Sequence, residues 1–211
     1  RTVSATFNYY GFSAFFNPLV DQFGWSRAAL AGVLSLSRLE GGAMAIPAGF
    51  MFDRIGPRKM MFVGVLFTGV GYMLLSRTNS LLYFYLVFIF VVQVGASFGM
   101  GGGAVDVAIA NWFRRKRGRA MGFATMGFSF GGILVTPLAF FITQYSWRSA
   151  LMLAGVSTIA LGIPLSYLVR HKPEPYGYLP DGDPPKPVDP PQVSNSNQGQ
   201  ETAGSSSNLD E

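Results

Sequence analysis

The sequence of 211 residues contains no cysteine and a single histidine, His171. These absences exclude a disulfide framework, a cysteine metal site and a cluster of histidine ligands, and they leave no Cys–His pair for nucleophilic catalysis. Charged residues are also scarce, at 13% of the chain, whereas 49% of the residues are hydrophobic. A soluble domain needs more polar residues to cover its surface. The composition indicates a membrane protein, and we expect neither an enzyme nor a bound metal or cofactor.

Long apolar segments fill most of the first 170 residues. About 20 mostly apolar residues cross the roughly 30 Å of hydrocarbon in a bilayer. Six such segments are expected, at residues 3–20, 28–52, 59–75, 81–112, 120–144 and 149–169. The sequence therefore predicts an all-α polytopic membrane protein, with a six-helix transmembrane bundle over residues 1–170. The first segment is short and begins close to Arg1, so we expect this helix to be truncated or the chain to be a fragment.

The composition changes completely after Lys172. Residues 171–211 are rich in Pro, Ser, Asn, Gln and Asp, and they contain almost nothing that could be buried in a core. Such a segment cannot offset its own ordering entropy. We expect it to be a disordered cytoplasmic linker or tail.

Basic residues are distributed unequally between the two ends of the expected helices. Only Arg27, Arg77 and Arg148 lie at one end, whereas the two turns at residues 54–59 and 114–119 place many basic residues at the other. Positively charged turns stay on the cytoplasmic side of a membrane. We therefore expect a multi-pass protein of the cell membrane with both chain ends in the cytoplasm. The net charge of +5 is explained by this bias, so the partner is the lipid bilayer and not a nucleic acid.

The first of these turns, residues 49–59, has the pattern Gly-x-x-x-Asp-Arg-x-Gly-x-Arg-Lys. Gly49 would allow one helix to pack closely against a neighbour. Gly56 followed by Pro57 suits the start of the next helix. Asp53 lies at a helix C-terminus, the unfavourable end of the dipole for an anion, so it should have a cationic or N–H partner. From the residues alone, this turn could be an ordinary cytoplasmic hairpin.

The same pattern resembles the loop between the second and third helices of the major facilitator superfamily. Pro57 stands where the usual pattern has a basic residue, as in the branches similar to oxalate/formate antiporters and monocarboxylate porters. Residues 11–28, 111–122 and 171–183 resemble those branches too. The resemblance implies the first half of a twelve-helix carrier, whose second six-helix half is missing here. It also implies a conformational gating loop made of Gly49, Asp53, Arg54, Gly56, Arg58 and Lys59.

Three ionisable residues, Arg38, Glu40 and Asp106, lie inside the expected helices. A charge at the centre of a bilayer costs about 2.5–3.5 kcal/mol on insertion scales, so these side chains should avoid lipid. Arg38 and Glu40 are two positions apart, about 200° around a helix, and cannot pair well with each other. Either residue could line a substrate path or form a buried ion pair, and Glu40 could gain or lose a proton. Asp106 is a third candidate for the substrate path or for coupling, and its alternative, which we expect, is a pair with the basic residues of the 49–59 loop.

Uncharged polar residues in the first and fourth expected helices are further candidates. The resemblance implies that these two helices line the central cavity, which favours Asn8, Tyr9, Tyr10 and Gln93 as path residues. They could equally form hydrogen bonds between helices. The glycines of residues 99–103 lack the features of a nucleotide-binding loop. Close helix packing explains them, as it explains Gly127 and Gly131.

The resemblance implies a secondary active transporter that works by alternating access. Its substrate would be a small organic solute, a monocarboxylate or a related anion. Two alternatives stay open: a membrane sensor or scaffold that transports nothing, and a half-size carrier that acts as a homodimer.

Overall fold

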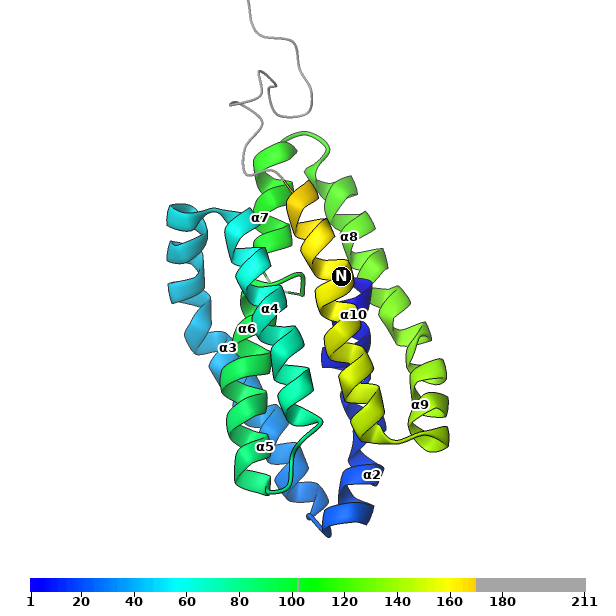
Figure 1. Ribbon diagram of the computed structural model, residues 1–211. Coiled ribbons are helices and arrows are strands. Elements are labelled where there is room, and N and C mark those ends of the chain that lie inside the picture. The colour runs from blue at the N-terminus through cyan, green and yellow to red at the C-terminus, as the bar shows by residue number, and fades with distance from the viewer. Residues whose placement is uncertain (102, 170–211) are drawn as a thin grey trace, which may run out of the picture.

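The computed structural model describes residues 1–101 and 103–169, so the expected tail at residues 171–211 lies outside the described part of the chain. The described residues form helices and no strands (Figure 1). The elements are α1 (Thr2–Ser4), η1 (Ala5–Tyr10), α2 (Phe12–Phe23), α3 (Arg27–Ile55), α4 (Pro57–Leu75), α5 (Leu81–Val87), η2 (Phe88–Gln93), α6 (Val94–Phe98), α7 (Gly103–Trp112), α8 (Arg117–Ile133), α9 (Val135–Gln144) and α10 (Trp147–Leu168).

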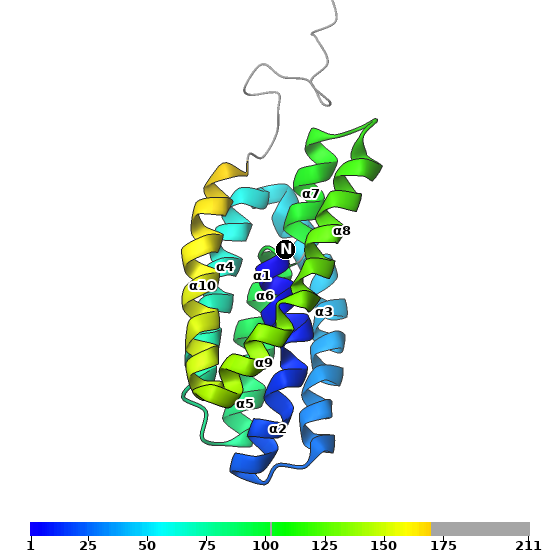
Figure 2. The same cartoon turned by 90° about the vertical axis from the view of Figure 1, so that its right-hand side faces the viewer.

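Five helical stretches in the described residues are long and apolar enough to cross a membrane. They are α3, α4, α5 to α7, α8 with α9, and α10. The expected first span is built from α1, η1 and α2, which follow one another along the same direction (Figure 2). The fold is therefore an all-α bundle of the expected type, in which the first span consists of three shorter pieces.

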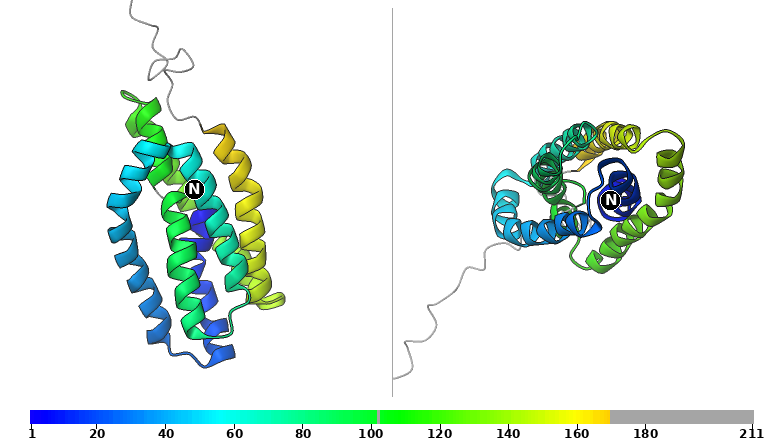
Figure 3. Two further views of the ribbon diagram at one scale, coloured as in Figure 1. Left: turned by 60° about the vertical axis from the view of Figure 1, so that its left-hand side comes forward. Right: turned by 90° about the horizontal axis from the view of Figure 1, so that it is seen from below.

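The first span lies in the middle of the bundle. Its pieces contact α3, α8, α9 and α10, and the end-on view in Figure 3 shows it enclosed by the other helices. Figure 2 shows it between the α4–α10 pair on one side and α3 with α8 on the other. A movement of the first span would therefore change its contacts with α3, α8, α9 and α10.

Helix α4 holds the bundle together through very close helix contacts. It packs most extensively against α10 and also against α6. A Cβ on Gly64 would lie 2.6 Å from the Gly95 carbonyl oxygen, and a Cβ on Gly155 would lie 2.6 Å from the Gly69 carbonyl oxygen. Only glycine allows two backbones to approach this closely. The same reason explains the expected packing of Gly131, where a Cβ would lie 2.6 Å from that of Ala5.

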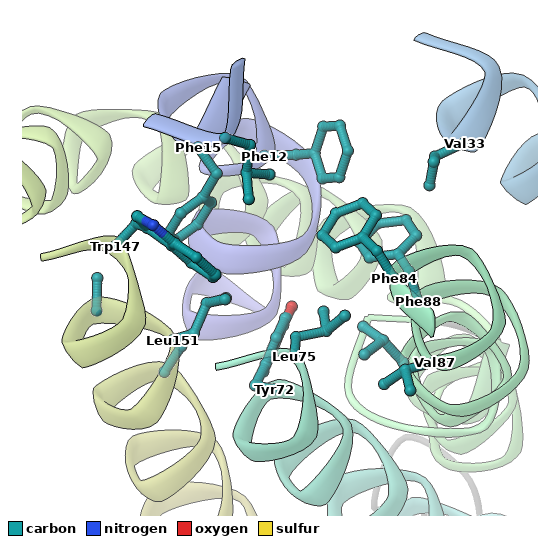
Figure 4. Close-up of a cluster of buried hydrophobic side chains, with 14 of the residues drawn as sticks. Phe12, Phe15, Val33, Tyr72, Leu75, Phe84, Val87, Phe88, Trp147 and Leu151 are labelled. Atoms are coloured by element: carbon teal, nitrogen blue, oxygen red, sulfur yellow. The ribbon is translucent and has the colours of Figure 1, made fainter. Parts of the chain in front are cut away.

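A cluster of aromatic and aliphatic side chains joins the helices at the end of the bundle opposite the α3–α4 turn (Figure 4). The Phe12 and Phe88 rings lie 4.9 Å apart, and the Phe84 and Phe88 rings stack at 5.8 Å. Leu75 and Trp147, from α4 and α10, are buried in the same cluster. This cluster fixes how far the first, third, fourth and sixth spans are shifted relative to one another along the bundle axis.

The turn between α3 and α4 consists of the single residue Gly56. Its φ of 88° and ψ of 150° lie in a region that favours glycine, and Pro57 begins α4 at a position where its missing N–H costs nothing. The expectation for this turn is confirmed. Helix α3 runs three residues further than expected, to Ile55, so Asp53 lies inside its last turn.

Besides the first span, the fourth and fifth spans are also interrupted. Gly99 has an extended conformation (φ −86°, ψ −152°) that ends α6 before α7 begins, so the glycines of this segment break the helix as well as packing against Gly64. Leu134 separates α8 from α9. The cause there is Pro137, which has no N–H to offer the Ile133 carbonyl. The fourth and fifth spans lie where they were expected, and each contains an interruption that was not predicted.

Candidate functional site

Both expected cavity-lining helices contain a π-helical turn, and the polar candidates lie in those turns. Asn8, Tyr9 and Tyr10 belong to η1, and Gln93 ends η2. In η1 the Gly11 amide donates to the Thr6 carbonyl, five residues back. Turns of this kind are rare and occur frequently at functional sites. The sequence identified these residues as polar but gave no signal for the π-helical geometry.

Asn8, Glu40 and Gln93 lie at similar depth in the bundle. Asn8 precedes Phe12 by four residues, Gln93 follows Phe88 by five, and Glu40 follows Val33 of the same aromatic cluster by seven. At about 1.5 Å per residue along their helices, Asn8 lies about 6 Å from Phe12, Gln93 about 8 Å from Phe88 and Glu40 about 11 Å from Val33, in each case toward the α3–α4 turn. Three spans therefore place polar side chains in one layer.

Arg38 and Glu40 point in different directions, as their spacing requires. Buried residues of α3 recur at Leu30, Val33, Ser37, Ala48 and Phe52, and Glu40 falls on this packed stripe. Its Oε1 atom is buried and has no hydrogen-bond partner among the described residues. Arg38 is exposed on another face of α3. Within the described chain neither residue forms an ion pair, so the proposed buried pair is not found inside this half.

The exposed surface of α3 divides into two strips of different chemistry. One strip, here called the polar strip of α3, follows the helical repeat with small, polar or charged residues: Ser35, Arg38, Gly42, Ala45, Gly49 and Asp53. The other, the apolar strip of α3, contains Leu36, Leu39, Ile46 and Phe50, which are 43%, 70%, 84% and 63% exposed. Lipid suits the apolar strip, whereas small residues and a charge are typical of contact with another helix or an aqueous path.

Helix α8 repeats this division. Gly118, Gly122, Thr125 and Ser129 form the polar strip of α8, and Phe123 and Phe130 are exposed beside it. A Cβ at Gly42, Gly49, Gly118 or Gly122 would meet no described atom within 4 Å. Gly49 was expected to pack against a neighbour, and this neighbour is not among the described helices. Correspondingly, only 17% of the residues in the apolar stretch of α3, and 17% in that of α8–α9, are buried, compared with 50% in that of α4.

Asp106 is paired with a residue that the sequence analysis did not consider. Its Oδ1 accepts a hydrogen bond from the Arg1 guanidinium, and the two side chains are 44% and 15% exposed. Asp106 also lies in the first turn of α7, where the helix dipole favours an anion. The expected pair with the 49–59 loop is not formed, because the first span reaches Asp106 instead.

Five of the six residues expected to form a gating loop are exposed, and the sixth, Gly56, is buried at the turn between α3 and α4. Asp53 is exposed and forms no ion pair with a described residue, so the expected partner of Asp53 is not found here. The Arg54 guanidinium lies 5.7 Å from the Phe50 ring centre, and that of Arg58 lies 5.2 Å from the Tyr167 ring centre. Lys59 is exposed next to them. Both arginines thus contact aromatic rings instead of Asp53.

Aromatic residues border the π-helical turn of the first span. Tyr9 is 66% exposed, and the Tyr9 and Tyr10 rings lie 5.2 Å and 5.5 Å from the Phe128 ring. Phe128 is one of 19 phenylalanines, and nothing in the sequence distinguishes it from the others. Tyr72 and Thr158, two buried residues with hydroxyl groups in apolar helices, were likewise not predicted.

Comparison with known proteins identifies the family. The family model of the Major Facilitator Superfamily matches residues 2–199. The chain belongs to the major facilitator superfamily.

Several curated relatives are similar over most of this chain. It is 27% identical to human (Homo sapiens) monocarboxylate transporter 14 over 143 residues, covering 67% of this chain and 28% of that protein. It is 25% identical to the oxalate:formate antiporter of Oxalobacter formigenes over 162 residues, covering 76% and 38%. It is 27% identical to the membrane sensor protein UhpC of Salmonella typhimurium over 161 residues, covering 75% and 36%. The chain thus spans less than two fifths of each relative.

Proposed function

We propose that this chain is the N-terminal half of a secondary active transporter that carries a small organic anion by alternating access. One observation supports this most strongly: α3 exposes Arg38 about midway along its 29 residues. A cation at this depth is too costly to face lipid, so it faces an aqueous path or a partner. A guanidinium on such a path attracts a carboxylate. Two of the relatives, a monocarboxylate transporter and an oxalate:formate antiporter, agree with this substrate class.

The partner of this half is a second six-helix bundle. This second bundle would pack against the polar strips of α3 and α8. Small residues there allow close contact between helices, and they offer lipid chains little apolar surface. The path then runs between the strips, next to Asn8, Tyr9, Tyr10 and Gln93. Glu40, in the same layer, is the candidate for coupling transport to a proton. Asp106 belongs to a pair that fixes the first span to α7.

The 49–59 loop is the conformational gate in this proposal. Asp53 forms no ion pair with the residues that the structure describes, so it is available to the second bundle when the cytoplasmic side closes. A helix N-terminus there would attract its carboxylate by about 0.3–2 kcal/mol. Both chain ends lie in the cytoplasm, because the basic residues gather at the α3–α4 and α7–α8 turns.

A membrane sensor that binds a solute without moving it is the second candidate. It is favoured by one observation, the similarity to the membrane sensor protein UhpC. A homodimer of half-size carriers would cover the same two strips with a second copy of this chain.

Counterflow in proteoliposomes separates these functions. Vesicles that contain the full-length protein are loaded with an unlabelled monocarboxylate, and the labelled compound is added outside. We expect transient accumulation above that in protein-free vesicles. Arg38→Gln should raise the half-saturating concentration about 10- to 100-fold, because a hydrogen bond to a charged group contributes about 1.5–3 kcal/mol. Arg77→Gln, at the exposed outer turn, is the matched control and should leave it unchanged.

Binding without counterflow would contradict transport and support the sensor. Equal effects of the two substitutions would show that Arg38 does not contact the solute.

A further inference from the structure

The α4–α10 pair forms a wall of the bundle on the other side of the first span from α3 and α8 (Figure 2). Away from its contacts with α10 and α6, α4 exposes four apolar residues, here called the apolar stripe of α4: Val63, Phe67, Val70 and Leu74. They recur every three or four positions, so they follow one line along the helix. Lys59 is exposed one turn before Val63 and continues this line. The line therefore begins at a cation and extends about 22 Å from it, at about 1.5 Å per residue.

Two cations, Arg58 and Lys59, lie at this end of the wall without an acidic partner. Neither forms an ion pair with a described residue. Neither α4 nor α10 contains an aspartate or a glutamate, and Asp53, across the Gly56 turn, forms no ion pair with either cation. The polar strips of α3 and α8, against which the second bundle is proposed to pack, lie on the other side of the first span. The two charges are therefore open to an anion from outside the protein.

Aromatic rings fix the position of one of these cations. The Arg58 guanidinium carbon lies 5.2 Å from the centre of the Tyr167 ring. This ring packs edge-on against Phe62, with 6.1 Å between the two ring centres. Contact with an aromatic ring holds a guanidinium in place, and its five N–H groups remain available as donors. Tyr167 is exposed, and its hydroxyl can donate one further hydrogen bond. Arg58 is thus positioned between α4 and α10, next to a second donor.

We infer that Arg58, Lys59 and Tyr167 bind the phosphate of an anionic phospholipid whose acyl chains lie along the apolar stripe of α4. A guanidinium binds two phosphate oxygens at once, and the lysine ammonium adds a point charge. A lipid fits better than a soluble phosphate, because the cations lie at the head of an apolar stripe that only acyl chains would cover. The inference rests on the proposed orientation, which places the α3–α4 turn at the cytoplasmic leaflet, where anionic lipids are concentrated.

Thermal unfolding of the full-length protein in a non-ionic detergent tests the lipid site without requiring transport. A ligand that binds only the folded state raises the Tm. Dioleoylphosphatidylglycerol should therefore raise it saturably, and the neutral dioleoylphosphatidylcholine should not. Arg58→Gln and Lys59→Gln should each raise the half-saturating mole fraction of the anionic lipid about fivefold, and the double variant about 25-fold, since each cation near an anionic surface contributes about that factor.

Arg77→Gln is the matched control, because it removes an exposed cation at the opposite end of α4. Its half-saturating mole fraction should equal that of the wild type. The comparison of mole fractions holds even where a substitution changes the Tm of the lipid-free protein.

Equal stabilisation of the wild type by the two lipids would overturn the inference. So would an Arg77→Gln variant that loses as much lipid affinity as the double variant. Stabilisation by glycerol phosphate at the same phosphate concentration, lost in the double variant, would replace the lipid with a soluble anion. Lipid binding as expected in a protein that shows no counterflow would reject transport and leave the lipid site standing.

Discussion

Gly64→Ala should destabilise the bundle severely although it adds only one methyl group. The new Cβ would lie 2.6 Å from both the Gly95 carbonyl oxygen and the Gly99 Cα. These are backbone atoms of the fourth span, which cannot move without separating α4 from α6. Overpacking of this kind costs about 3 kcal/mol or more, which lowers the Tm of a domain of this size by about 6–12 °C. The measurement is thermal unfolding of the purified protein in detergent.

Val63→Leu is the matched control for this prediction. It also adds one carbon, one residue away on α4, but Val63 is 43% exposed on the outer surface. Its Tm should stay within about 1 °C of that of the wild type, since surface substitutions rarely change stability by more than about 0.5 kcal/mol. Equal Tm values for the two variants would show that α4 and α6 are not in backbone contact.

Glu40→Gln should abolish uphill accumulation of the solute while leaving exchange intact. The carboxylate lies on the packed stripe of α3 and has no ion-pair partner among the described residues, so its replacement by a neutral side chain breaks no bridge in this half. The Tm should therefore be retained. If Glu40 carries the coupled proton, accumulation driven by a pH gradient should fall to the level of simple equilibration. The measurement compares pH-driven uptake with counterflow in the same vesicles.

Asp21→Asn is the control, because Asp21 is exposed at the outer end of the first span. Uptake by this variant should follow the wild type. A large loss of stability in Glu40→Gln would instead assign Glu40 to a buried pair with the second half. Unchanged accumulation and unchanged stability would contradict both roles.

The number and order of the spans could be predicted from the sequence because apolar length and basic turns act locally. Helix α10 begins two residues before its expected start and α4 begins two residues early, at Pro57. The Gly56–Pro57 turn was predicted for the correct physical reason. The breaks at Gly99 and Leu134 were not, since glycines and a proline in an apolar run are compatible with a packed helix as well as with a broken one.

The candidate site was predictable in its residue types but not in its partners. The cost of burying charge identified Arg38, Glu40 and Asp106, and their spacing separated Arg38 from Glu40. No local pattern indicates that Asp106 pairs with Arg1, 105 residues away. The π-helical turns likewise have no local pattern in the sequence.

The measurement that tests the central proposal most directly compares two single cysteines on α3 of the full-length protein. The 211 residues described here contain no cysteine, and any cysteine in the rest of the protein is first replaced with serine. Gly42→Cys lies on the polar strip of α3, and Leu39→Cys lies three residues away on the apolar strip, at a position that is 70% exposed. In membranes, we predict that a water-soluble thiol reagent modifies Gly42→Cys much faster than Leu39→Cys, and that a transported monocarboxylate changes the rate only at Gly42→Cys. Equal rates at the two positions, or a faster reaction at Leu39→Cys, would contradict an aqueous substrate path along this face.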